Sequence, residues 1–503
     1  MSNGSDLEMQ SRADIRQDCE ELLWLANDRV HRLSTLRSRH RKYLIPETSE
    51  MLLKQVTEMI RVYRDVSVEL LSTMKQSKVG DIEEMISVHR RIADQLRSLQ
   101  GVSAALCVAP DWQSPSFLHS QQSQAGMETG KITGTINDYK RDQHGIGLKY
   151  EQKYCFEYID ASLRLAPQVF VTASGMAAMT TILACLLKDE TCTGPILIGK
   201  SSYFENIQLV QLYFPGRIIF VDEMDTAGIL EAIAVHTPSA LFLDTICNAI
   251  TLAAPDCSAL FPQIAKIVTA PLTIVLDTTG AGTSYQPLQD MPFWGKFLRL
   301  VAFESLLKYH QFGMDRVSGG VVWRSILSPV ALFTHRKSLG TNLVDSSVLA
   351  LPTPNRKRLD MRLHRHHRNA TLIAVGLDQL NTEASQTALQ QVVYPGLPSH
   401  PAYAWMKLRL FHGSAIVLVL KEQYRNTATY KKFLQIAVDE ARKLGVDLVG
   451  GSSFGFSITR IYLTALHATG TAEPFLRVSV GTETVMEIEK ITKAITRALE
   501  KLA

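Results

Sequence analysis

The feature that most constrains the fold is a series of six short apolar runs between residues 168 and 303. The runs are rich in β-branched residues and alternate with segments of helical periodicity; they read QVFVT, PILIG, RIIFVD, ALFLD, LTIVLD and LRLVAF. Each run has the length of a buried strand, and strands that alternate with helices build parallel βαβ units. The sequence therefore predicts an α/β fold with a mostly parallel sheet.

The first hundred residues have a different pattern, in which apolar residues recur every three or four positions. Stripes of this kind run through residues 22–33, 52–74 and 82–99, and they are typical of helices that bury one face. Residues 110–135 are rich in Ser, Gln and Gly, so we expect a linker there. A basic run from Arg29 to Lys42 lacks acidic residues and is expected to be a solvated helix face.

The last third of the chain has a third pattern. After about residue 335 come a basic helical stretch, an apolar strand at 415–420 and a closing helix at 487–503. A chain of 503 residues can hold up to three domains. We therefore expect a helical N-terminal extension with linker (1–130), a large α/β domain (131–335) and a smaller C-terminal α/β domain (336–503).

Composition excludes several classes of protein. Hydrophobic residues make up 46% and charged residues 20% of the chain, which is ordinary for a globular protein and not for a disordered one. The net charge of +4 does not indicate a nucleic-acid partner. The longest clean apolar run has six residues, so we expect no membrane span, and the first ten residues do not resemble a leader. Seven cysteines without a C-x-x-C pair indicate reduced thiols and a cytoplasmic location.

Three short motifs match known chemistry only in part. Residues 451–455 fit the G-x-S-x-G nucleophile elbow, but no acid lies between Ser453 and the next histidine. The S-x-x-K at 305–308 lacks the S-D-N and K-T-G companions of penicillin-binding enzymes. Six Lys and Arg within 356–368 would repel a metal cation, so we expect no metal site and interpret the histidines there as part of a surface helix. These histidines are His364, His366 and His367.

Three other segments together offer the groups that a phosphorylated aldehyde cofactor needs. Ser174-Gly175-Met176 follows the first strand-like run and opens a helical run, which suits a phosphate. Asp277 ends a strand-like run, at the edge of a parallel sheet where ligands bind. Lys308 follows another such run in an apolar context, which lowers the proton affinity of its amine. A phosphate cradle, an acid for the pyridine nitrogen and an amine for the Schiff base are what pyridoxal phosphate (PLP) requires.

Longer motifs in the same order strengthen this interpretation. They are T-A-S-G-M-A-A at 172–178, D-T-I-C-N at 244–248, D-T-T at 277–279, S-L-L-K-Y at 305–309, R-L-H-R-H-H-R-N-A at 362–370, Y-P-G-L-P-S-H-P at 394–401 and L-R-V-S-V-G at 476–481. With them, residues 135–503 resemble the PLP-dependent enzymes of cysteine and methionine metabolism, such as cystathionine γ-synthase, cystathionine γ- and β-lyases and methionine γ-lyase. The resemblance implies fold type I, with a mostly parallel seven-stranded sheet in the large domain. The helical extension is an addition.

The resemblance assigns roles around the cofactor. Tyr203 is expected to stack on the cofactor ring and, with Lys308, to move protons as a catalytic residue. Asn248 is expected to bond the phenolic oxygen of the cofactor. The full set of cofactor-binding residues expected within one subunit is Ser174, Gly175, Met176, Tyr203, Asn248, Asp277, Thr279, Ser305 and Lys308.

Two further pairs complete the expected site. Arg477 and Ser453 match the family's ligands for the substrate carboxylate. Tyr139 and Arg141 match a segment that reaches the cofactor phosphate of a neighbouring subunit. The resemblance therefore implies an amino-acid substrate and a homodimer or homotetramer with shared active sites.

The expected activity is γ-elimination or γ-replacement on the side chain of an L-amino acid. The same residues also suit β-elimination by a C–S lyase, or γ-elimination of a leaving group such as halide. A non-catalytic relative that acts as an assembly partner through its helical extension is a further alternative. Leu307, Glu304 and the segment 204–206 depart from the family's pattern at positions that line the substrate side chain's space in relatives.

Overall fold

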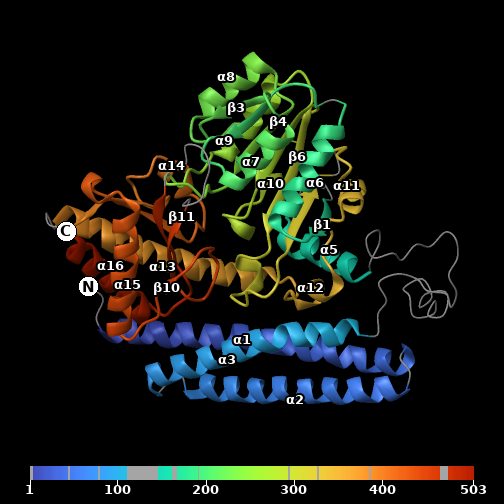
Figure 1. The fold of residues 1–503 in the computed structure, drawn as a ribbon, viewed down its shortest axis with the longest axis vertical. Helices are drawn as coiled ribbons and strands as arrows, with labels where there is room; N and C mark the ends of the chain where they lie inside the picture. The colour runs from blue at the N-terminus through green and yellow to red at the C-terminus, as the bar shows by residue number, and fades with distance from the viewer. Residues whose placement is uncertain are drawn as a thin grey trace.

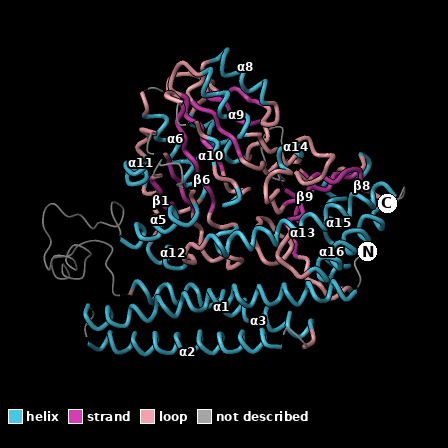
Figure 2. The backbone as a smooth tube through the Cα atoms, turned by 180° about the vertical axis from the view of Figure 1, so that it is seen from behind, coloured by secondary structure: helices cyan, strands magenta, loops and turns pink. Residues whose placement is uncertain are grey.

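The computed structural model describes residues 4–43, 46–76, 80–109, 145–160, 167–190, 192–292, 295–325, 328–383, 387–464 and 474–503. Two regions, each built on a β-sheet, lie side by side, and three long N-terminal helices run beneath both of them (Figure 1). The view from behind shows the same arrangement, with the helices of the extension stacked along one side of the molecule (Figure 2).

The larger sheet has seven strands. Its order is β1 (Gln168–Thr172), β7 (Gly320–Arg324), β6 (Leu298–Ser305), β5 (Leu272–Asp277), β4 (Ala240–Asp244), β2 (Ile196–Gly199) and β3 (Ile218–Val221). Strands β2 to β6 run parallel to one another, whereas β7 is antiparallel to both β6 and β1. The predicted α/β fold is therefore confirmed. All six apolar runs form strands, and β7 is a further strand that they did not include.

Helices cover both faces of this sheet because each buried strand presents apolar side chains in both directions. Alternate residues of β4, β5 and β6 pack with α6 (Gly175–Lys188) on one face and with α8 (Thr226–His236) and α9 (Cys257–Ile267) on the other. The helices of this region are α5 (Gly145–Tyr158), α6 (Gly175–Lys188), α7 (Phe204–Tyr213), α8 (Thr226–His236), α9 (Cys257–Ile267), α10 (Pro287–Asp290) and α11 (Leu332–Leu339).

The smaller sheet has five strands. Its order is β10 (Val449–Gly450), β11 (Arg460–Thr464), β12 (Phe475–Ser479), β9 (Ala415–Leu420) and β8 (Leu389–Val393). The remaining elements are η2 (Gly282–Ser284), η3 (Tyr309–Gln311), α12 (Asp345–Ala350), α13 (Arg356–Glu383), α14 (Tyr403–Met406), η4 (Glu422–Tyr424), α15 (Thr427–Lys443) and α16 (Val485–Leu502). The domain boundaries stay predictions: residue 130 and the expected linker lie outside the described residues, and residue 335 falls within α11.

The expected helical extension is present as α1 (Gly4–Tyr43), α2 (Pro46–Gln76) and α3 (Ile82–Val108). The apolar stripes face inward, with Val56, Tyr63 and Leu70 of α2 buried. Helix α1 contacts the other two helices and α16, and α3 contacts α12. The extension is thus packed against both sheet regions. Among the described helices, none combines the length and the apolar character that crossing a bilayer requires.

Two expectations about basic segments are wrong at particular residues, although the side chains of the run from Arg29 to Lys42 are described only as far as residue 35. Arg29 is buried instead of solvated, and its guanidinium donates hydrogen bonds to the backbone carbonyls of Ala350 and Leu351 at 2.9 and 3.0 Å. The histidine-rich helix α13 is not simply a surface helix, because His366 is fully buried and bonds the carbonyl oxygen of Val480 at 2.8 Å. Both side chains are buried by segments distant in the sequence.

Candidate active site

A cavity of about 520 Å³ lies at the carboxyl ends of β4, β5 and β6 and is closed on its other side by the smaller sheet. Every predicted site residue that the structure describes lines this cavity: Ser174, Gly175, Met176, Tyr203, Asn248, Asp277, Thr279, Ser305, Lys308, Ser453 and Arg477. Tyr139 and Arg141 lie outside the described residues. The motifs, which span three hundred residues of sequence, thus converge on one place.

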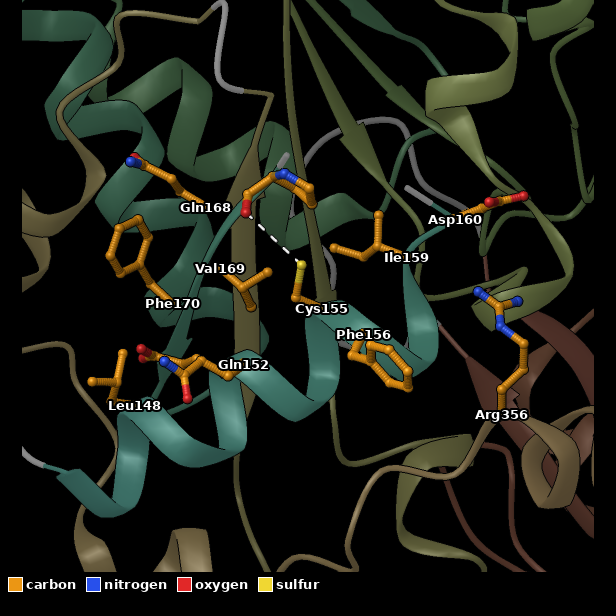
Figure 3. Close-up of a pocket in the computed structure, with 12 residues that line it drawn as sticks. Leu148, Gln152, Cys155, Phe156, Ile159, Asp160, Gln168, Val169, Phe170 and Arg356 are labelled. Atoms are coloured by element: carbon orange, nitrogen blue, oxygen red, sulfur yellow. Dashed lines mark hydrogen bonds between the residues drawn. The ribbon is translucent and has the colours of Figure 1, made fainter. Parts of the chain in front are cut away.

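A second cavity, of about 890 Å³, lies between α5 and β1 (Figure 3). Leu148, Phe156, Ile159 and Val169 give it an apolar wall, and the Cys155 thiol lies 3.9 Å from the carbonyl oxygen of Pro167. None of the predicted site residues lines it. We therefore place the candidate active site in the smaller cavity.

The N-terminus of α6 forms one end of the site. Ser174 caps the helix, and its hydroxyl oxygen accepts a hydrogen bond from the Ala177 N–H at 3.0 Å. The N–H groups of Gly175 and Met176 stand in the first turn, where the helix itself supplies no acceptor and the helix dipole favours an anion. A Cβ atom at position 175 would lie 3.0 Å from the Cβ of Ser305. A side chain at position 175 would therefore press against Ser305, which lines the same cavity.

Asp277 is the acidic group of the site. Its carboxylate accepts hydrogen bonds from the Thr279 N–H at 2.9 Å and from the Asn206 amide at 3.3 Å. Burial raises its pKa, and these hydrogen bonds oppose the rise. The Thr279 hydroxyl also accepts from the Ser305 N–H at 3.0 Å, so Thr279 ties the ends of β5 and β6 together. A buried carboxyl held in this way is suited to pair with a protonated ring nitrogen.

Lys308 is the amine of the site. Its Nζ atom donates to the Ser453 hydroxyl at 2.6 Å and lies 5.1 Å above the Phe454 ring. Burial, followed by the charge of Arg477, lowers the pKa of Lys308 to about 8. An amine with this pKa is largely deprotonated in mildly alkaline solution, which makes it a nucleophile and a proton acceptor.

Arg477 extends from β12 toward Lys308. Its guanidinium donates to the Asn248 side-chain oxygen and, at 3.4 Å, to the carbonyl oxygen of Ser453. The side chain is buried, and burial lowers the pKa of Arg477 to about 10. The group still carries its charge at neutral pH, so the cavity presents a cation that suits a carboxylate.

Tyr203 precedes α7, and its backbone N–H donates to the Asp244 carboxylate at 2.9 Å. Burial, and then the neighbouring Glu205, raise the pKa of the Tyr203 phenol, so it keeps its proton. Burial and the charge of Asp277 likewise raise the pKa of Asp244. The sequence did not assign a role to Asp244 or Asn206. Asp244 begins the motif D-T-I-C-N, and Asn206 lies in the segment 204–206, which departs from the family's pattern. These positions were the only signals for the two residues.

The departures from the family's pattern fall in two places. Glu205, Asn206 and Leu307 line the cavity, as the resemblance implied. The expectation for Glu304 is wrong, because it lies on the other face of β6 from Ser305. There its carboxylate bonds the Tyr154 hydroxyl and lies 3.0 Å from the His310 ring nitrogen.

The residues of this cavity fit PLP. A glycine-lined helix N-terminus, a buried acid and a lysine of lowered pKa surround one space, with an arginine and a tyrosine beside them. Together with the mostly parallel seven-stranded sheet, they define a PLP-dependent enzyme of fold type I.

Comparison with known proteins supports this class. The sequence model of the family described as Cys/Met metabolism PLP-dependent enzyme matches residues 100–500. A bifunctional enzyme, flvA, from Aspergillus flavus is 26% identical over 345 residues, which is 67% of this chain but only 39% of that protein. An L-methionine gamma-lyase from Fusobacterium nucleatum is 27% identical over 439 residues, covering 85% of this chain and all of the lyase.

Solved structures show the same fold. A cystathionine gamma synthase from Xanthomonas oryzae in complex with cystathionine matches with a TM-score of 0.58 at 19% identity, over 79% of this chain and 93% of that one. CalE6, a methionine gamma lyase from Micromonospora echinospora, matches with a TM-score of 0.57 at 20% identity, over 72% and 89% of the two chains. The chain belongs to the family of Cys/Met metabolism PLP-dependent enzymes.

Proposed function

We propose that this protein is a PLP-dependent lyase or transferase that eliminates or replaces a substituent at the γ-carbon of an L-amino acid. The observation that carries the proposal is the cavity in which Lys308, Asp277 and Arg477 meet beside the N-terminus of α6. Membership of the family supports it. So do the relatives named methionine gamma-lyase and cystathionine gamma-lyase.

Each residue has a part in this proposal. PLP, when bound, supplies an electron sink for negative charge at the substrate α-carbon. The N–H groups of Gly175 and Met176 bind the phosphate, and Asp277 keeps the ring nitrogen protonated. The Lys308 amine first holds the cofactor. With PLP bound, its freed Nζ atom would accept the α-proton, pass that proton to the cofactor, and so regain the neutral amine needed to accept a β-proton of the substrate.

The substrate is held by the opposite wall of the cavity. The Arg477 guanidinium and the Ser453 hydroxyl bind its carboxylate, which fixes the α-proton near Nζ of Lys308. The Tyr203 phenol keeps its proton, because its pKa is raised, and it can donate that proton to a leaving group. Asn248 orients the Arg477 side chain through the hydrogen bond between them.

A substrate screen tests the proposal. The purified protein is incubated with PLP and with amino acids that carry thioether, acyloxy or halide groups at either the γ- or the β-carbon. Release of ammonia and a keto acid is measured, and a thiol acceptor is added to detect replacement. We expect γ-substituted substrates to react and the Lys308→Ala variant to be inactive on all of them.

The alternatives are outcomes of the same screen. Reaction of β-substituted substrates alone would identify a β-eliminating C–S lyase, and reaction of the γ-halide alone would identify a specialised dehalogenating lyase. No reaction, together with no uptake of PLP, would identify a non-catalytic relative. The lowered pKa of Lys308 and the buried Arg477 favour the enzyme.

The proposal includes an assembly. We expect a homodimer or homotetramer in which Tyr139 and Arg141 of one subunit reach the phosphate bound by its neighbour, and a cytoplasmic location. Sedimentation at several protein concentrations tests whether the protein is a homodimer or homotetramer. A monomer with full activity would contradict it.

A further inference from the structure

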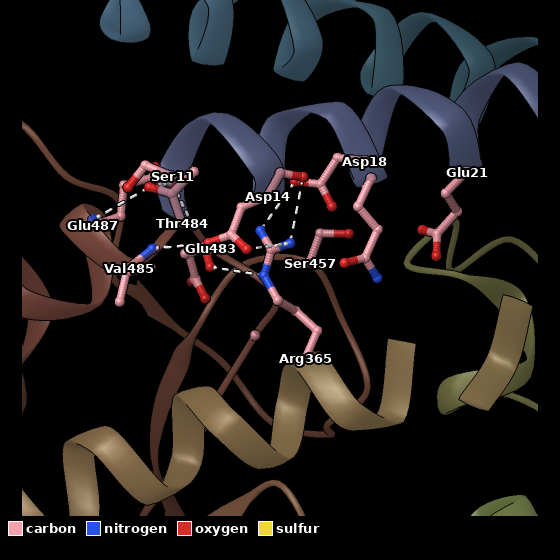
Figure 4. A network of polar contacts seen from close by, with 12 residues as sticks. Ser11, Asp14, Asp18, Glu21, Arg365, Ser457, Glu483, Thr484, Val485 and Glu487 are labelled. Carbon is pink, nitrogen blue, oxygen red and sulfur yellow. Dashed lines mark hydrogen bonds and ion pairs between the residues drawn. The ribbon is translucent and has the colours of Figure 1, made fainter. Parts of the chain in front are cut away.

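Helix α1 of the extension contacts the active-site region through buried charges. The acidic side chains of Asp14, Asp18 and Glu21 point from α1 toward α13 and the segment around Glu483 (Figure 4). The Glu21 carboxylate lies 2.7 Å from Nη1 of Arg362, whose side chain is 1% exposed. A charge buried this deeply needs its partner, so the pair fixes the position of the Arg362 guanidinium.

The same guanidinium holds a loop of the active site. Its Nη2 atom donates to the carbonyl oxygen of Gly455 and to the hydroxyl of Ser457, both at 3.2 Å. Two residues earlier in the loop, Ser453 accepts the hydrogen bond from Lys308. Arg362 therefore connects α1 to a loop that touches the reactive amine.

The loop itself is strained and closely packed. Ser453 has φ of 72°, in the left-handed region that side chains other than glycine seldom adopt. Gly455 has φ of 83°, and a Cβ atom there would lie 2.7 Å from the backbone carbon of Lys308. A strained conformation persists only when neighbouring groups hold it, and Arg362 is one of the groups that do so here.

The extension also contacts the segment that follows Lys308. The Trp24 ring packs edge-on against Phe312, with centroids 4.8 Å apart, and Arg97 donates to the Gly313 carbonyl at 3.2 Å. A Cβ atom on Gly313 would lie 3.0 Å from Nη2 of Arg362. Loop 453–457 and the segment that follows Lys308 therefore both lie next to Arg362, the arginine that pairs with Glu21 of the extension.

We propose that the helical extension supports the active site, and that Glu21 is a positioning residue that acts through Arg362 on loop 453–457. The effect on substrate rests on the proposed function, because it assumes that Ser453 binds the substrate carboxylate. The effect on the loop itself does not rest on that assumption.

The test compares Glu21→Ala and Glu21→Gln with Asp14→Ala. Asp14 is a matched control, because it is also a buried acid of α1 that pairs with arginines of α13, Arg365 and Arg368, whose contacts do not include the loop. Hydrogen exchange of residues 453–457 is measured in the cofactor-free protein, and kcat and KM are measured in the PLP-loaded protein.

We expect Glu21→Ala to speed exchange in loop 453–457 and to raise KM by about tenfold with a smaller change in kcat. Glu21→Gln, which keeps an acceptor oxygen for Arg362, should show smaller changes in the same direction, and it serves alone if Glu21→Ala does not fold. Asp14→Ala lowers the stability of the whole protein, so without denaturant it should speed exchange in loop 453–457 much less than Glu21→Ala does, and it should leave KM unchanged.

Unchanged loop exchange in the Glu21 variants, or equal changes in Asp14→Ala, would overturn the proposal. If no amino acid reacts with the wild-type protein, the proposed function fails, and loop exchange alone decides whether Glu21 positions the loop. Faster exchange with an unchanged KM would overturn the role in substrate binding.

Discussion

The reactivity of Lys308 depends on its neighbours more than on its place in a motif. Burial and the nearby Arg477 charge both favour the neutral amine and lower its pKa to about 8. Below that pH the amine is protonated and unreactive, and it becomes a nucleophile as the pH rises through that value. Replacing Arg477 with leucine removes the nearby positive charge, so the pKa of Lys308 should rise.

The pH dependence of Lys308 acetylation in the cofactor-free protein measures this change. In Arg477→Leu the midpoint of reactivity should move to a higher pH than the wild-type value of about 8. Arg299→Leu is the control, because Arg299 lies at the far end of β6 and pairs with Asp189. A midpoint that stays in place in Arg477→Leu would show that Arg477 does not tune the amine.

Glu205 places a carboxylate in the cavity beside Tyr203. A negative charge there should disfavour substrates whose side-chain substituent is anionic. Glu205→Gln should therefore raise kcat/KM for anionic relative to neutral γ-substituents by about tenfold or more. The control is Glu231→Gln, which changes an exposed glutamate on α8. Equal ratios in wild type and Glu205→Gln would exclude a role in selectivity.

Motifs predicted which residues meet, but not all of their contacts. The described site residues share one cavity because their motifs end strands or begin helices, and those ends coincide in a parallel sheet. The bond from Asn206 to Asp277 depends on how α7 starts, which the sequence does not show. Successive side chains of a strand point to opposite faces of the sheet. This alternation would have predicted that Glu304 points away from the cavity that Ser305 lines.

Between elements, α1 and α13 are joined by a cluster of charges around Asp14. Its carboxylate lies 3.1 Å from Arg365 and 2.7 Å from Arg368, and it accepts from the Val485 N–H at 3.1 Å. Removing it leaves the buried Arg365 with fewer partners. Asp14→Ala should therefore lower the free energy of unfolding by about 3–5 kcal/mol.

Denaturant titration measures this loss of stability. Glu8→Ala is the control on the same helix, because Glu8 is half-exposed and its pair with Arg12 should contribute less than about 1 kcal/mol. A loss in Asp14→Ala no larger than that in Glu8→Ala would show that the cluster does not stabilise the docking of α1.

The sequence predicted the helices of the extension but not where they dock. Their apolar stripes are visible in the pattern, whereas the acceptors of Arg29 are backbone carbonyls more than three hundred residues away. Neither the composition nor the charge pattern of a sequence shows which backbone carbonyls a side chain will contact. The basic run therefore resembled a solvated face, although its first arginine is part of an interface.

At the scale of the whole molecule, the extension and the large sheet share one apolar core. Buried side chains of α1, α2 and α3 form a continuous cluster with those of β4, β5 and β6. The extension should therefore unfold together with the large sheet. Leu33→Ala, which truncates a fully buried side chain of α1, should cost about 2–5 kcal/mol.

Hydrogen exchange near the unfolding midpoint distinguishes shared from separate unfolding. Peptides from α1 and from β5 should lose protection together in Leu33→Ala, whereas Leu71→Ala, at an exposed position of α2, should change neither. Loss of protection in the extension alone would show that the two parts unfold independently.

Division of the chain into an extension and two sheet regions was visible in changes of pattern along the sequence. The arrangement of the extension beneath both sheets was not, because it is set by contacts between residues far apart in the chain (Figure 1). The proposed chemistry depends on one covalent link, between PLP and Lys308.

That link is measured by adding PLP to the purified protein, reducing it with borohydride and locating the pyridoxyl group by peptide mass spectrometry. We predict a visible absorption band before reduction, one labelled peptide that contains Lys308, and neither in Lys308→Ala. A protein that takes up no PLP, or a label that persists on another lysine in Lys308→Ala, would contradict this prediction.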